Sequence, residues 1–561
     1  MTTTTGRDLE DGLDPRPAPD APTNGPTTTV GRDAEGLRIP PLRERLSPPM
    51  PVDRVIGWLA PLLITAVAGF FRFWNLGNPA KFVFDETYYP KDAWSLLNYG
   101  VEHQFVEKAN DLIVGGNLNV FVNPLQPSFV VHPPAGKWLI ALGEWAVGMN
   151  PFGWRVAIAV LGTLSILVMA RLVRRLTRST LLGCVAALLL ALDGLHLVES
   201  RIALLDLPVM FWLLLGLSTL LIDRDWMRRR IADAAEPLGR IAPGQWGPRL
   251  LWRPWRLVAG LCFGLAIATK WSAIIPLAVF GLLTVWWDWG ARRAVRSTLF
   301  RVSTFFRAIL DAFVAFVTMV FTAALVYVAS WTGWLVTTTG YDRKWATDKD
   351  PVFLGVSLPN PLPGLFDPLR SLWHYHQEIW TFHTNLTDTH QYQSSPWSWL
   401  VVGRPVSFDW VDKIGPDKGC STDRCVQEIL GIGTPILWWG ATIAVIACLV
   451  FWLAGRDWRF GIPVLGVAAT WIPWFQYDDR PIFYFYAIVI LPFLVIGATL
   501  VLGKVLGPPE APPNRRMWGA ALVGGFVLLV ALNFAYLFPI LTDQTITYAE
   551  WLSRMWLKTW V

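Results

Sequence analysis

The stretch GWRVAIAVLGTLSILVMARLVRRLTR occupies residues 153–178 and joins an apolar run to a basic one. Residues 153–170 are long enough to cross a membrane, because a helix needs roughly 17 to 25 apolar residues to span a hydrocarbon core of about 30 Å. The basic run at 171–178 is typical of the cytoplasmic end of a span, beside anionic lipid. This stretch therefore predicts a membrane-spanning helix whose C-terminal end is cytoplasmic.

The rest of the chain alternates between similar apolar runs and polar connections. Of its 561 residues, 53% are hydrophobic and 16% are charged, against roughly 45–50% and about 25% in soluble domains. This composition excludes a soluble enzyme, and the 33 Trp residues suit many membrane boundaries. The net charge of +6 does not indicate a nucleic-acid partner, since loop Lys and Arg explain it. We expect an all-α polytopic membrane protein with about eleven spans, at 55–74, 153–170, 181–198, 203–222, 256–269, 272–288, 309–330, 436–454, 461–475, 482–503 and 517–540.

The polar segments predict the domain organisation. Residues 1–50 hold no long apolar run, which predicts a disordered cytoplasmic tail and no signal peptide. With this tail inside, the inside connections are roughly twice as dense in Lys and Arg as the outside ones. The transmembrane domain is expected over 51–545, with an extracytoplasmic C-terminal tail at 546–561. Its long outside loops, 75–152 and 331–435, are candidates for function because loops of this length often carry it.

Adjacent carboxylates follow the first predicted span, in the segment FDETY at 84–88. Burying Asp85 and Glu86 in an aromatic setting at a membrane boundary is costly, and their like charges oppose joint ionisation. These conditions favour a general base. An ordinary pair of surface acids is the alternative interpretation.

Further charged residues fall in the first outside loop or at the outer ends of the spans. His132 and Lys137 belong to HPPAGK, where two prolines fix the backbone before a predicted surface helix at 136–148. Charged side chains at span ends usually face a protein interior, a cavity or a ligand, although lipid-anchoring Arg and Lys are the alternative. The span-end residues are Arg155, Arg201, Asp206 and Lys270.

Several cations beside a carboxylate suit a phosphate-bearing substrate. The sequence has no GxxxxGK[ST] motif and no GxGxxG motif after a strand, which argues against a soluble nucleotide donor. A lipid phosphate is therefore the natural candidate. The carboxylate would deprotonate an acceptor hydroxyl that attacks the carbon bearing this phosphate, and the cations would stabilise the departing group.

Five segments resemble those of the protein O-mannosyltransferases, in the same order. They are FDETYY (84–89), VHPPAGK (131–137), WR (154–155), ESRIALLDLPVMF (199–211) and TKWS (269–272). The resemblance extends over most of the chain after the tail. It is to the bacterial, actinobacterial branch, because the second long outside loop is too short for the soluble β-trefoil domain that eukaryotic members carry there.

The resemblance implies a glycosyltransferase C fold and a specific reaction. A single mannose would pass from polyprenyl phosphate mannose to Ser or Thr hydroxyls of exported proteins, at the outer face of the plasma membrane and with inversion at the sugar carbon. No cofactor, nucleotide or obligatory metal would take part. The implied partners are the donor lipid, the acceptor proteins, membrane lipids and the Sec translocation machinery, with no nucleic acid.

The resemblance also assigns roles by position. Asp85 would be the base and Glu86 a supporting or peptide-contacting acid. Arg155 would bind the donor phosphate or organise the active site. The other matched residues are expected to line or brace the same site: His132, Lys137, Arg201, Asp206 and Lys270.

The late segment WFQYDDRPIFYFY at 474–486 resembles the family's arginine-and-aromatic segment. Arg480 would then contact the lipid phosphate, and Tyr484 and Tyr486 would flank the prenyl chain. The eukaryotic pattern has a His pair where Tyr484 and Phe485 stand, so this chain departs from the pattern at that point.

Four His residues occur between 374 and 390 in the second long outside loop. A spacing of seven places His376, His383 and His390 near one face of a helix. This favours a polar wall facing the donor or the acceptor, while a plain surface loop remains the alternative. The spacings fit no closed zinc pattern, so we expect no metal. Cys420 and Cys425 in the same loop are able to form a disulfide in an oxidising compartment.

Three other functions are alternatives to this one. A polyprenyl-phosphate-dependent transferase acting on an envelope lipid or polysaccharide would have the same fold. The HPPAGK and SRIALLD segments favour a protein acceptor, but these residues do not determine the identity of the sugar. A secondary transporter predicts inverted repeats and midplane charges, and the sequence has neither. A scaffold that only assists export would tolerate the loss of Asp85.

Overall fold

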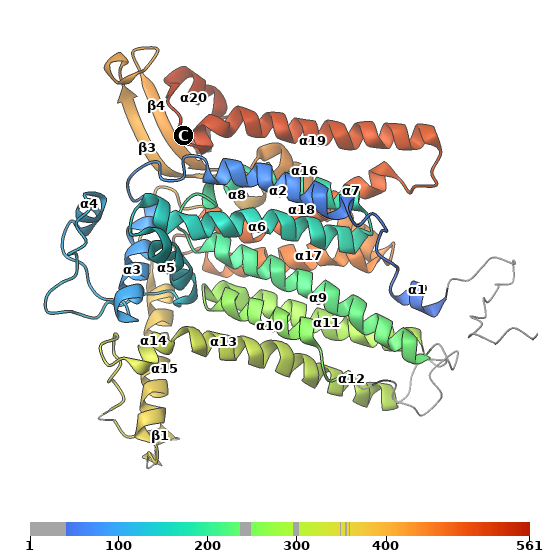
Figure 1. Ribbon diagram of the computed structural model, residues 1–561, viewed down its shortest axis with the longest axis horizontal. Helices are drawn as coiled ribbons and strands as arrows, with labels where there is room; N and C mark the ends of the chain where they lie inside the picture. The colour runs from blue at the N-terminus through green and yellow to red at the C-terminus, as the bar shows by residue number, and fades with distance from the viewer. Residues whose placement is uncertain are drawn as a thin grey trace, which may run out of the picture.

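The computed structural model describes residues 41–235, 248, 250–295, 302–347, 349–353, 356–357 and 360–561. Most of these residues are helical, in a bundle whose long helices run side by side (Figure 1). The first 40 residues of the predicted tail lie outside the described part, and residues 41–50 include the short helix α1 (Leu42–Leu46).

Seven of the described helical segments are long and apolar enough to cross a membrane. They are α2 (Ile56–Phe73), α6 (Pro151–Thr177), α9 (Asp206–Ala235), α11 (Ile274–Ala294) with the 3₁₀ turn η3 (Trp271–Ala273), the continuous helix of α12 (Val302–Ala315), η4 (Phe316–Phe321) and α13 (Thr322–Ser330), α16 (Pro435–Leu453) and α19 (Pro513–Leu541). Shorter helices complete the bundle: α7 (Thr180–Ala191), α10 (Pro254–Ile267), α17 (Trp458–Trp471) and α18 (Leu491–Leu506). Each of the eleven predicted spans falls on one of these helices.

Several shorter helices are interrupted, and their continuations lie near one end of the bundle. After α7, Asp193 caps a new helix, α8 (Gly194–Glu199), by accepting from the backbone N–H of His196. Helix α17 passes into the 3₁₀ segment η7 (Ile472–Tyr477), and η8 (Tyr484–Val489) precedes α18. The interruptions place polar loop residues beside the ends of the long helices.

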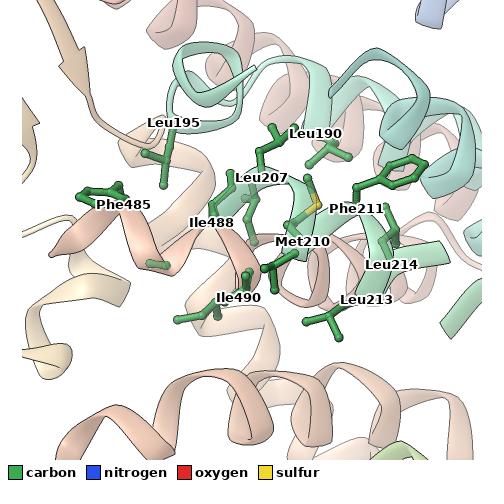
Figure 2. Packing of buried hydrophobic residues seen from close by; sticks show 14 of the residues in the cluster. Leu190, Leu195, Leu207, Met210, Phe211, Leu213, Leu214, Phe485, Ile488 and Ile490 are labelled. Carbon is green, nitrogen blue, oxygen red and sulfur yellow. The ribbon is translucent and has the colours of Figure 1, made fainter. Parts of the chain in front are cut away.

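The central helix of the bundle is α9. In its most apolar window 83% of the residues are buried, against 22% in α19, which lies at the edge of the bundle (Figure 1). Figure 2 shows its first turns packed against α7, α8 and η8, through Leu207 and Met210 on α9, Leu190 on α7 and Ile488 on η8. This apolar packing fixes the position of the start of α9, where Asp206 lies.

The first long loop folds against the same end of the bundle. It contains η1 (Phe84–Thr87), α3 (Tyr89–Tyr99), α4 (Ala109–Val114) and α5 (Ala135–Val147). Helix α5 coincides with the predicted surface helix and packs against α3 and α6. It exposes Leu142 and Trp145 on its outer side.

The second long loop corrects the all-α prediction. It contains α14 (Thr332–Val336), the short strand pair β1 (Val352–Phe353) and β2 (Val356–Ser357), α15 (Pro363–Asn385), η5 (Pro396–Val401), β3 (Val406–Ile414), η6 (Pro416–Lys418) and β4 (Cys425–Gly431). Strands β3 and β4 are antiparallel, with Val406 opposite Gly431. A disulfide joins Cys420 to Cys425 near the hairpin turn, a pairing that the sequence left open. The fold is mostly helical but not all-α, because residues 406–414 pair with 425–431 as strands, and residues 406–409 alternate between buried and half-buried side chains.

The C-terminal residues complete this sheet. Strand β5 (Ile546–Thr547) pairs with β4, so that Cys425 lies opposite Thr547 and the strand order is β3-β4-β5. Helix α20 (Tyr548–Arg554) follows, and the indole N–H of Trp551 donates to Glu428 on β4 at 2.6 Å. The chain ends in η9 (Lys558–Trp560), where Trp560 is buried and donates to the carbonyl of Val402.

Candidate active site

Asp85 lies in η1, directly after the left-handed residue Phe84, whose φ is +47°. Non-glycine residues rarely adopt this conformation unless the surroundings hold them. Here the Phe84 ring packs edge-on against Phe408, Phe483 and Phe485, with centroids 5.3 to 6.0 Å away. The aromatic cluster thus anchors the residue that precedes the candidate base.

Asp85 is half-buried and interacts with charged residues from two helix ends. Burial raises the pKa of Asp85 to about 6, while the nearby Lys270 ammonium and a hydrogen bond with Tyr89 act in the opposite direction. A carboxylate with this pKa is largely ionised at neutral pH and accepts a proton more readily than an ordinary aspartate. The environment of Asp85 therefore suits a general base.

Glu86 points away from Asp85 into a fully buried ion pair with Arg155. The guanidinium donates to both carboxylate oxygens, at 2.8 Å from Nε and 2.7 Å from Nη2. Glu86 also accepts from the backbone N–H groups of Val83 and Ala203. The neighbouring acids thus face different environments, one open to a reactant and the other saturated by protein donors.

Arg155 has no N–H left for a substrate in this arrangement. Its remaining donors reach three carbonyls of the first loop, those of Leu76, Pro79 and Lys81, at 2.9 to 3.2 Å. A guanidinium has five N–H donors, and all five are used. This geometry favours the organising role for Arg155 rather than contact with the donor phosphate, because its bonds hold the loop that carries Asp85.

Lys270 and Asp206 form an ion pair whose two charges both act on Asp85. The Nζ of Lys270 lies 2.7 Å from Oδ2 of Asp206 and 4.9 Å from the centre of the Tyr486 ring. Lys270 follows α10 and Asp206 starts α9, so the pair joins the two helix ends at the site.

A cavity of about 310 Å³ opens beside this pair. Among the predicted site residues, His132, Lys270, His383, Arg480 and Tyr486 line it, together with an aromatic wall that includes Trp271, Trp380 and Trp474. The cavity therefore combines two cations with flat apolar surfaces.

The two imidazoles in the cavity are held neutral. Burial holds the pKa of His132 well below its usual range, and nearby Lys270 lowers it further. Burial also lowers the pKa of His383. Its Nε2 donates to the Val131 carbonyl at 3.1 Å, so its Nδ1 accepts from Arg480 at 3.3 Å.

Arg480 is incompletely used by the protein. Its Nη1 bonds only to the ring and carbonyl of His383, and its buried Nε has no hydrogen-bond partner among the described residues. A buried donor without a partner costs free energy unless a ligand or water satisfies it. Arg480 is therefore the guanidinium in this cavity that is available to an anion.

Besides Asp206, which pairs with Lys270, four predicted substrate-binding residues lie away from the cavity lining, and their polar groups are engaged. Lys137 pairs with Glu102, and Arg201 donates to carbonyls at the end of α2. The hydroxyl of Tyr484 accepts from the Gly433 N–H. His376 donates from Nδ1 to the Leu372 carbonyl and accepts from the Tyr327 hydroxyl at 2.5 Å. Each of these four residues therefore bonds to another part of the protein and does not face the cavity.

The four His residues of the second loop do not converge. His376 and His383 lie on α15, but this helix ends at Asn385, so His390 falls beyond it and packs on Phe84 and Phe483. His374 stacks on Trp345 and lies near Asp342 and Glu378. These two acids and His374 present ligand atoms within 4.8 Å of one another, which is the metal-compatible group among the described residues.

Residues that the sequence analysis assigned no role also shape the site. Tyr89 hydrogen-bonds to Asp85 from one helical turn later, and this spacing is a signal the sequence offered. Trp271 lines the cavity, and its indole N–H donates to Tyr327 at 2.9 Å. Nothing local in the sequence indicates that contact, since 56 residues separate the two side chains.

Comparison with known proteins places this arrangement in a family. The model described as dolichyl-phosphate-mannose-protein mannosyltransferase matches residues 62–333, and the one described as the C-terminal four TMM region of protein-O-mannosyltransferase matches residues 368–503. A polyprenol-phosphate-mannose–protein mannosyltransferase of Mycolicibacterium smegmatis (strain MKD8) is 37% identical over 547 residues, 95% of this chain and 98% of the relative. The chain belongs to the protein O-mannosyltransferase family.

Other relatives agree with this membership. The mannosyltransferase of the same description from Mycobacterium tuberculosis (strain ATCC 25618 / H37Rv) is 37% identical over 518 residues, 91% of this chain and 93% of the relative. Among solved structures, the Saccharomyces cerevisiae protein O-mannosyltransferase Pmt1-Pmt2 complex bound to the sugar donor matches with a TM-score of 0.67. It is 14% identical, and the match covers 96% of each chain, which shows the shared fold.

Proposed function

We propose that the protein transfers one mannose from a polyprenyl phosphate mannose lipid to Ser or Thr hydroxyls of exported proteins. Family membership over 95% of the chain supports a lipid-linked mannose donor and a protein acceptor. The observation that carries the reaction is the grouping of Asp85 with Lys270 beside a cavity that also contains Arg480. No specific contact among the described residues favours another function.

The reaction follows from these positions. Asp85 accepts the proton of the acceptor hydroxyl while the oxygen of that hydroxyl attacks the anomeric carbon of mannose. The bond from this carbon to the phosphate oxygen breaks in the same step. The departing polyprenyl phosphate gains negative charge, which Lys270 and Arg480 stabilise. Because attack comes from the side opposite to the leaving group, the sugar carbon is inverted.

Several further residues hold this geometry in place. Glu86 and Arg155 fix the loop of Asp85, and Asp206 orients Lys270. His376 positions Tyr327, which in turn holds Trp271 in the cavity wall. Tyr486 contributes a ring beside Lys270.

The proposed topology has eleven spans, with a cytoplasmic N-terminal tail and an extracytoplasmic site and C-terminus. The seven long helices and the four shorter ones at the predicted positions support this count. The proposed domains are a cytoplasmic tail at 1–50, the catalytic transmembrane domain at 51–545 and the C-terminal segment 546–561. Acceptors would be met outside as the Sec machinery exports them.

A transfer assay with purified protein tests the proposal. Protein in nanodiscs is incubated with radiolabelled polyprenyl phosphate mannose and a Ser/Thr-rich peptide, in EDTA. Asp85→Asn should lower turnover by about 10² to 10⁴-fold, since a general base contributes this much. Asp111→Asn is the matched control, because Asp111 is an exposed acid of the same loop.

Two outcomes would contradict the proposal. If Asp85→Asn retained more than about a tenth of the wild-type turnover, Asp85 would not be the base. If label passed to an added envelope lipid but not to the peptide, the acceptor would be wrong while the fold and the chemistry stood.

A further inference from the structure

A second cavity, of about 600 Å³, lies at the opposite end of the bundle from the active site. It is enclosed by α1, by residues 47–54 and by the C-terminal parts of α6 and α9. Helix α6 starts at the active site with Arg155 in its first turns and runs 27 residues, about 40 Å, toward this cavity. The two cavities are therefore separate, and this one does not depend on the proposed reaction.

The lining of this second cavity is strongly basic. Seven arginines line it, namely Arg43, Arg54, Arg171, Arg174, Arg175, Arg178 and Arg229, whereas the acids that line it are Glu44 and Asp225. Two acids outside the lining neutralise part of this charge, since Asp53 pairs with Arg174 and Asp233 with Arg43. Arg175 and Arg178 both donate to the same oxygen of Asp225, at 2.8 Å. Arg54 forms no ion pair with any described residue. Positive charge thus exceeds negative charge in a confined space, which favours an anionic ligand.

The mouth of the cavity continues into an apolar surface. Trp58 lines the cavity, and the Arg171 guanidinium lies 3.8 Å from the centre of its ring. On the same helix, α2, Leu59 and Leu63 are 63% and 64% exposed and face away from the bundle core. An anionic group in the cavity would therefore have an apolar helix face beside it, which suits a lipid with an acyl or prenyl chain.

We propose that this basic cavity binds the phosphate headgroup of an anionic membrane lipid, with the hydrocarbon chains lying along α2. Arginine forks match phosphate oxygens, and the headgroup neutralises arginines that the protein's own acids leave in excess. Two lipids carry this chemistry, a phospholipid such as phosphatidylglycerol and a polyprenyl phosphate. Both place the phosphate in the cavity and the chain against Leu59 and Leu63.

Matched variants test this binding site in the full-length protein. Arg54→Gln with Arg229→Gln removes two exposed arginines of the lining. The control, Arg45→Gln with Arg230→Gln, removes two exposed arginines close to them in sequence that do not line the cavity. Both double variants change the net charge equally. Binding of short-chain phosphatidylglycerol, phosphatidylcholine, polyprenyl phosphate and inorganic phosphate is measured by thermophoresis in detergent micelles.

The expected result is tight binding of phosphatidylglycerol or polyprenyl phosphate, with little binding of phosphatidylcholine. The cavity variant should lose about 30-fold in affinity, at about fivefold for each arginine near an anionic headgroup, and the control less than about twofold. Whichever lipid is more sensitive to the cavity variant is the natural source. An equal loss in the control, or competition by inorganic phosphate at the lipid's own concentration, would overturn the proposal. Retained mannosyl transfer in the cavity variant keeps this test independent of the active site.

Discussion

Helix α6 carries arginine at both ends, and the two ends differ in how that charge is neutralised. At the active-site end, Arg155 meets a buried carboxylate and three carbonyls, which use all of its donors. At the other end, Arg175 and Arg178 share one aspartate beside a cavity lined by further arginines. The same residue type thus fixes a loop at one end and leaves positive charge for a ligand at the other.

The largest effect on stability and activity should come from removing the counter-charge of Arg155 at the active-site end of α6. Glu86→Gln keeps the size of the side chain but removes its charge, which leaves Arg155 buried without a counter-charge. Loss of one partner of a buried pair costs about 3 to 5 kcal/mol, so the thermal midpoint should fall steeply and mannosyl transfer should be lost. Thermal unfolding in detergent followed by intrinsic fluorescence measures it.

Glu107→Gln is the matched control for this experiment, because Glu107 is an exposed acid of the same loop. If Glu86→Gln unfolded at the same temperature as this control, the buried pair would not be what holds the loop.

A smaller effect is expected from replacing Lys270, the cation beside Asp85 and the cavity. Lys270→Met removes charge beside Asp85 and the cavity, and turnover should fall by about 10² to 10³-fold, as when one stabilising donor is lost. Lys108→Met, at an exposed position of the first loop, should leave turnover unchanged. Steady-state kinetics with labelled donor separates the two, and a normal turnover number for Lys270→Met would remove this lysine from the mechanism.

The pH dependence of mannosyl transfer tests the role of Asp85 at the active-site end of the bundle. Burial raises the pKa of Asp85 to about 6, so the reactive carboxylate is mostly ionised at pH 7 and half-protonated near pH 6. Turnover should therefore fall to about half its plateau near pH 6 and continue to fall below it. Because Lys270 lowers this pKa, the midpoint should move to higher pH in Lys270→Met. A flat profile between pH 5 and 7 would exclude Asp85 as the titrating base.

The smallest effect on stability is expected at the unsaturated end. Arg229→Gln removes an exposed side chain whose hydrogen bond is to the backbone of its own helix. The change in unfolding free energy should stay within about 0.5 kcal/mol, as for most surface substitutions. A large loss of stability in the same fluorescence assay would show that these arginines hold the fold rather than a ligand.

Much of the fold was predictable because hydropathy alone locates helices in a membrane protein. All eleven predicted spans fall on helices, since a lipid-facing helix needs a continuous apolar run. The sheet of β3, β4 and β5 was missed, because β3 is irregular in its register and β5 has only two residues and lies more than 100 residues from β4. Pairing over such a separation leaves no local pattern.

The residues of the site could be predicted where their role follows from residue type. Their hydrogen-bond partners could not be predicted, because these depend on which segments lie next to one another in the folded chain. The motifs located Asp85, Lys270 and Arg480, which lie at or beside one cavity. They did not reveal that Arg201 and Arg155 donate to backbone carbonyls, because those carbonyls lie at the end of α2 and in the loop after it, which only the folded chain brings to these side chains.

Strand β5 sets an order of events during biogenesis. The hairpin of β3 and β4 leaves the ribosome well before residues 546–547, and α19 must be placed before β5 can reach β4. The edge of β4 therefore stays unpaired until residues 546–547 have been synthesised, and the Trp560 contact with Val402 forms later still. A nascent chain that stops before β5 has the motifs of the active site but lacks the third strand of this sheet.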